Sequence, residues 1–127
     1  MTIADWLSDR GTGAPAQLLD GVREALGREG SRPAAEAAEV LIDVTERELA
    51  KWLAEDPPSR TGAVPLLTID ALVTLALEAA AERPGDIDAI AERALVRLSA
   101  LAGSERNRRS DARFSIPDSR PIDERSR

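Results

Sequence analysis

The residues Pro84 and Gly85 interrupt the longest helical pattern in this 127-residue chain, and they constrain its fold more than any other feature. On either side of them, residues 69–83 and 87–102 carry apolar side chains at every third or fourth position, with Ile90 and Leu95 among those expected to face the core. This spacing is typical of one face of an α-helix. Thr68 and Asp86 stand where N-capping side chains are preferred. Because a connection this short brings neighbouring helices side by side, the sequence predicts an antiparallel helical hairpin.

Three more helices are predicted ahead of this hairpin. Thr2 and Asp5 have the spacing of a capping box at the start of a short helix over residues 2–9. A second helix is predicted over residues 15–28 and a third over residues 33–56, where two prolines end it. A loop with a further break at Pro65 is predicted from Pro57 to Leu67. The third has the widest apolar surface, which indicates more than one neighbour. We therefore predict an all-α fold, a small bundle of about four helices with a short N-terminal helix, over residues 1–102.

Residues 103–127 are predicted to form a disordered, Arg-containing tail. Gly, Ser, Asn, Asp, Arg and Pro dominate this stretch, which leaves little apolar surface to offset the entropy of ordering it. Within it, Arg109 and Arg113 precede Phe114 and Ile116, which an extended strand would place on the same side. The tail is therefore a candidate short linear motif, and the alternative is a solvated tail without a specific role.

The composition excludes several chemistries. The chain has no Cys and no His, so disulfides, zinc sites, thiolate nucleophiles and catalytic pairs that need His are excluded. Only three aromatic residues are present, too few for a platform that stacks bases, and no Gly-rich loop matches a nucleotide-binding fingerprint. We therefore predict a protein that is not an enzyme, with no cofactor and no evident small-molecule ligand.

A row of carboxylates on the third helix is the best candidate for chemistry. Four acidic residues recur there at intervals of three, four and three, which places them on one face of a helix: Glu36, Glu39, Asp43 and Glu46. We interpret this acidic stripe as a solvated face, supported by an Asp43–Arg47 pair at helical spacing. The alternative is a site for a hard cation such as Mg²⁺ in an all-α hydrolase, with Glu78, Glu82 and Glu92 facing it.

Charge and hydropathy indicate where such a chain works. The net charge of −6 disfavours nucleic acids and anionic membranes. A helix-turn-helix regulator that reads DNA with Arg93 and Arg97 is an alternative, but Asp86, Asp88 and Glu92 stand where bases would be read. There is no export signal, and the apolar stretch over residues 63–81 looks too short and too polar to span a membrane. We expect a cytoplasmic protein, and the Arg, Ala and Glu bias is typical of a GC-rich bacterial genome.

By elimination, the sequence favours a non-catalytic protein that acts by binding other proteins, as an adaptor, small subunit or regulator. Its Ala-rich core buries little area per residue, so a protein partner or a homodimer formed through the apolar faces of the third and fourth helices is expected. Trp6 and Trp52 are interpreted as core residues, and an exposed Trp6 would instead anchor a partner. The candidate partner-binding residues are Trp6, Arg109, Arg113, Phe114 and Ile116.

Overall fold

The computed structural model describes residues 1–55 and 64–114, with side chains as far as residue 111. Within these residues the chain forms helices and no strand. The α-helices are α1 (Ile3–Arg10), α2 (Ala16–Leu26), α3 (Ala37–Ala54), α4 (Val64–Ala81) and α5 (Ile87–Phe114). Short 3₁₀ turns follow α1 and α2 and precede α3. The predicted all-α bundle with a short N-terminal helix is confirmed, and the predicted hairpin is α4 and α5.

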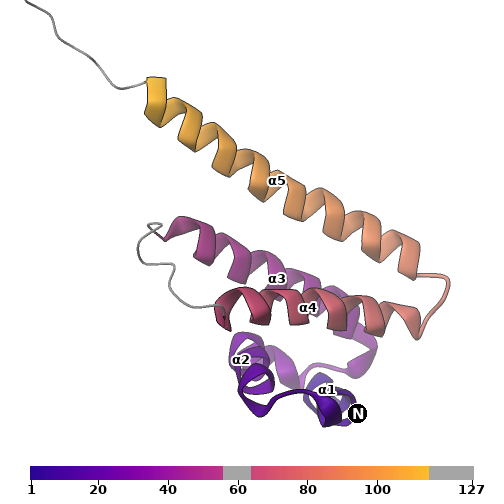
Figure 1. Cartoon of the computed structure of the whole chain (residues 1–127). Coiled ribbons are helices and arrows are strands. Elements are labelled where there is room, and N and C mark those ends of the chain that lie inside the picture. The colour runs from indigo at the N-terminus through magenta and orange to yellow at the C-terminus, as the bar shows by residue number, and fades with distance from the viewer. Residues whose placement is uncertain (56–63, 115–127) are drawn as a thin grey trace, which may run out of the picture.

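The central helix of the bundle is α3. It packs against α2, α4 and α5, and in Figure 1 α3 and α4 lie together between α1 and α2 on one side and α5 on the other. Its first turns are buried almost all round, at Ala37, Ala38, Val40, Leu41, Ile42, Val44 and Thr45. The buried hydroxyl of Thr45 donates to the backbone carbonyl of Leu41 at 2.7 Å, which satisfies it inside the helix. The expectation that this segment has several neighbours is therefore confirmed.

The N-terminus is anchored by the predicted capping box. The backbone N–H of Asp5 donates to Thr2 Oγ1 at 3.1 Å, and the backbone N–H of Thr2 donates to Asp5 Oδ2 at 3.0 Å. The Ile3 N–H then donates to the carbonyl of Arg32 at 2.9 Å, which ties α1 to the segment ahead of α3. These bonds aim Ile3, Trp6 and Leu7 into the core.

Helices α2 and α4 approach closely at one glycine. A Cβ atom at Gly21 would lie 2.7 Å from Thr68 Oγ1, so this position in α2 requires a residue without a side chain. At the end of α2, Gly27 has a φ of 53°, which L-residues with side chains rarely adopt. The first glycine therefore permits helix packing, and the second ends the helix.

Helix α4 begins earlier than its sequence predicts. It starts at Val64, so Thr68 lies inside the helix and is buried instead of capping it. Pro65, which we took as a break, stands in the first turn, where a missing N–H costs no intrahelical hydrogen bond. The prediction of a loop as far as Leu67 was wrong for this reason.

Helix α5 is longer than predicted, because it continues through residues 103–114 instead of ending near Ala102. Glu105 accepts from Arg108 at 2.7 Å and from Arg109 at 3.0 Å, one helical turn away, and such pairs stabilise helices. Gly103 alone costs only about 1 kcal/mol of helix stability. Residues 103–114 are therefore helical, and the predicted disorder of residues 115–127 lies outside the described residues.

We expect Gly21→Ala to be less stable than Gly103→Ala by about 1–3 kcal/mol in the free energy of unfolding. Both substitutions replace a glycine within a helix, so the gain in helix propensity is shared. Only at Gly21 does the new methyl group meet another side chain. Chemical denaturation measures the difference in the free energy of unfolding between the two variants. Adding Thr68→Ala to Gly21→Ala should remove this difference, because the side chain that the new methyl group meets is then shortened. Equal stability of the two single variants would contradict the close approach of α2 and α4.

The capping box predicts a pH dependence at Asp5. Hydrogen bonds from the backbone and side chain of Thr2 lower the pKa of this carboxyl below its ordinary value of 3.8. A lowered folded-state pKa stabilises the fold above the unfolded pKa, and this contribution is lost as the pH falls through the folded-state value. The melting temperature of the wild type should exceed that of Asp5→Asn at neutral pH, and the difference between the two melting temperatures should close below pH 3.8. A difference that stays constant down to the lowest pH would contradict this.

Candidate functional site

Arginines of α5 hold this helix against the acidic stripe of α3. Arg97 donates to Asp43 Oδ1 at 2.6 Å and also to Glu46, and Arg93 lies 3.2 Å from Glu39 Oε1. The hydrogen bonds to Glu46 and Asp43 raise the pKa of Arg97 above its ordinary value, so the guanidinium stays charged at any physiological pH. The Arg97 side chain is only 31% exposed, which reduces screening by solvent.

The stripe is therefore a contact between helices, and its fourth carboxylate, Glu36, pairs with Arg32 at 2.9 Å. We had interpreted it as a solvated face, but three of its members face the arginines of α5. The expected Asp43–Arg47 pair is absent among these contacts, because Arg47 donates instead to Glu29 at 2.9 Å and to the Ala25 carbonyl at 2.8 Å.

The same geometry weakens both alternative functions. In the described part of the chain no three acidic side chains gather as a metal site would need. Glu82, expected to face the stripe, accepts from Trp6 Nε1 at 2.8 Å and from Arg10 instead. Arg93 and Arg97, which a DNA-reading helix would direct at the duplex, are directed at α3.

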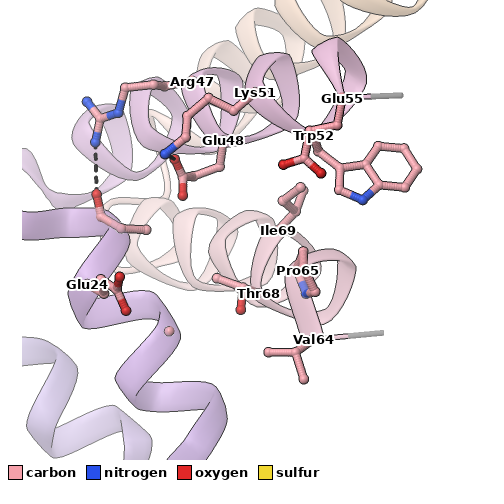
Figure 2. Close-up of a pocket in the computed structure, with 12 residues that line it drawn as sticks. Glu24, Arg47, Glu48, Lys51, Trp52, Glu55, Val64, Pro65, Thr68 and Ile69 are labelled. Carbon is pink, nitrogen blue, oxygen red and sulfur yellow. Dashed lines mark hydrogen bonds and ion pairs between the residues drawn. The ribbon is translucent and has the colours of Figure 1, made fainter. Parts of the chain in front are cut away.

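A cleft of about 400 Å³ lies between α2, α3 and α4 (Figure 2). Among the described residues, its two basic side chains each pair with a carboxylate. Lys51 donates to Glu48 at 3.0 Å, and Arg47 donates to Glu29 at 2.9 Å. Arg47 also donates to the Ala25 carbonyl on α2, as the dashed line in Figure 2 shows. Trp52 is half-buried at the rim of the cleft.

Apolar side chains are exposed on the outer surface of α4 and α5. Leu77 of α4 is 37% exposed, and Leu95 of α5 is 69% exposed. Leu77 also borders a small apolar void of about 10 Å³ between α3, α4 and α5, lined in addition by Ile42, Thr45, Val73, Ala76, Ala94 and Leu98. Ile90 is buried as expected, but the expectation that Leu95 faces the core was wrong. Leu95 lies about 140° from Ile90 around the helix and almost opposite Arg93 and Arg97, which pair with α3.

The other predicted partner-binding residues are dispersed. Trp6 is buried at 5% exposure, as expected of a core residue, so its ring is not available as an exposed anchor. Arg109 pairs with Glu105 on α5. Phe114 is the last residue of α5, so it is not part of an extended strand. The side chains of Arg113 and Phe114 and the whole of Ile116 lie outside the described residues.

Helix α4 differs from its sequence interpretation in one further respect. By length and composition alone it could cross a membrane, and it is the one such helix among the residues described. We had judged this stretch too short and too polar. A core helix of a soluble protein meets the same criterion, and α4 buries Leu72, Ala76, Ala79 and Ala80 within the bundle.

No protein-family model, curated protein or solved structure matches this chain. The function is therefore argued from the geometry above. Two features stand out in it, the paired charges between α3 and α5 and the exposed leucines beyond them.

Substituting Arg97 by Gln should loosen α5. It removes the charged donor from Asp43 and Glu46, at an expected cost of about 1 kcal/mol for a pair still partly screened by solvent. Amide hydrogen exchange over residues 87–100 should then accelerate about fivefold. The control is Arg109→Gln, which breaks a pair within α5 only and should leave these amides unchanged. Equal exchange in the two variants would contradict the role of Arg97.

Proposed function

We propose that this protein is a non-catalytic binding module, an adaptor, small subunit or regulator, that engages another protein chain through the outer surface of α4 and α5. The observation that supports this most directly is the exposure of Leu95 on α5 and of Leu77 on α4. Apolar surface left exposed on a small domain is characteristic of binding sites. The buried core includes five alanines, each of which removes little apolar area from water, while these two larger leucines remain at the surface.

The state of the charged residues also supports a binding role. The carboxylates of the acidic stripe and the basic groups of the cleft are engaged in ion pairs within the protein. In the described part of the chain, hydrogen bonds from Thr2 lower the pKa of Asp5, and hydrogen bonds to carboxylates raise the pKa of Arg32 and Arg97, so each of these shifts is explained by a partner within the fold.

The test compares Leu95→Asn with Val96→Asn. Both residues are exposed on α5, at 69% and 62%, and both substitutions replace an aliphatic side chain by the same amide. Val96 lies about 100° further round the helix and outside the α4–α5 surface. Tagged full-length chains are used to capture proteins from a lysate of the native host, and the captured proteins are quantified by mass spectrometry.

Leu95→Asn should reduce the captured partner about tenfold, as expected when a central apolar contact is lost, while Val96→Asn should retain it. Circular dichroism should show that both variants remain folded. A captured set that is identical for wild type and both variants would contradict the proposed surface.

A further inference from the structure

One stripe of α5 combines Leu95 with charges that have no partner. Six residues recur there at alternating intervals of four and three, which places them along one face of the helix: Asp88, Glu92, Leu95, Ser99, Ala102 and Arg106. All six are exposed. We call them the α5 seam.

The charges of the seam differ from the other charges of α5. Arg93 and Arg97 pair with α3, and Arg108 and Arg109 pair with Glu105. Over the part of α5 whose side chains are described, Asp88, Glu92 and Arg106 make no ion pair. The seam therefore begins with two unpaired acids and ends, about 27 Å along the helix, with an unpaired base.

From these observations we propose that the occupant of this surface is a second copy of the chain, with two α5 seams packed antiparallel in a symmetric dimer. This inference rests on the proposed function, because it names the partner for the same surface. The two-fold axis lies between the two helices at the level of residue 97. It places Asp88 against Arg106 of the partner subunit, and the same contact recurs at the other end of the helix pair. Leu95 then meets Ser99 of the partner subunit, and Glu92 meets Ala102 of the partner subunit.

The chemistry of the seam favours this arrangement over others. A parallel pair would bring the two Asp88 carboxylates together and the two Arg106 guanidiniums together, and like charges at close range repel. The antiparallel pair converts both repulsions into attractions. Ser99 and Ala102 are small, so the helices can approach closely around the two leucines.

The first measurement is the molar mass of the purified full-length chain over a concentration series, by light scattering. We expect a rise from 13.6 kDa towards twice that value, abolished by Leu95→Asn, a variant that circular dichroism should show to remain folded. A chain that stays at the monomer mass at every concentration would overturn the proposal.

Charge exchange then tests the pairing itself. Asp88→Arg and Arg106→Asp should each raise the dimer dissociation constant about tenfold or more, because each creates two like-charged contacts. A mixture of these two variants should form a heterodimer of near wild-type affinity, since every contact is again complementary. A dimer unaffected by either single exchange, or a mixture that fails to associate, would overturn this register.

The outcomes separate the two proposals. A monomeric chain that still captures a different protein through Leu95 rejects the second copy but leaves the binding function standing. A monomeric chain whose captured proteins do not depend on Leu95 rejects both.

Discussion

Arg97 of α5 donates to Asp43 and Glu46 of α3, and the arrangement of the last helix depends on this contact. Along the described part of α5, Ile90 is buried, and Ile87 and Ala94 on the same face pack against the core. The ion pairs of Arg93 and Arg97 hold the adjoining surface of α5 against α3. The consequence is that Ile90 and Ala94 face the bundle, while Leu95 and the rest of the α5 seam face solvent. The site proposed for a partner is thus produced by the contact that completes the fold.

The composition of the core is consistent with the proposed association. Its buried residues include Ala37, Ala38, Ala76, Ala79 and Ala80, which bring helices close together but remove little apolar area from water. Helices α2 and α4 approach closely at Gly21, where α2 lies against Thr68 of α4. A small core of this kind leaves a narrow margin of stability, and burial of Leu77 and Leu95 between chains would widen it.

Local patterns made the helices predictable, and long-range contacts made the site unpredictable. The capping box at Thr2 and the break at Pro84 act within a few residues, so their consequences could be read directly. Leu95 lies about 140° around the helix from Ile90, so the two residues do not share one face, and this angle was a signal in the sequence that Leu95 is exposed. The acidic stripe was recognised, but its partners stand some fifty residues later, at separations of 51 and 54 for Arg97. A second signal was available in the sequence, because Arg93 and Arg97 repeat the four-residue interval between Glu39 and Asp43.

The distance between the two copies of α5 tests the account most directly. The chain contains no cysteine, so Val96→Cys provides a single attachment point for a spin label, outside the α5 seam but beside the proposed two-fold axis. In an antiparallel pair the two Cβ atoms at this position would lie about 10 Å apart, and strong dipolar broadening is predicted in the full-length dimer. If the spectrum of the spin-labelled variant shows no dipolar broadening at a concentration at which the chain is dimeric, the proposed pairing of the two helices is contradicted.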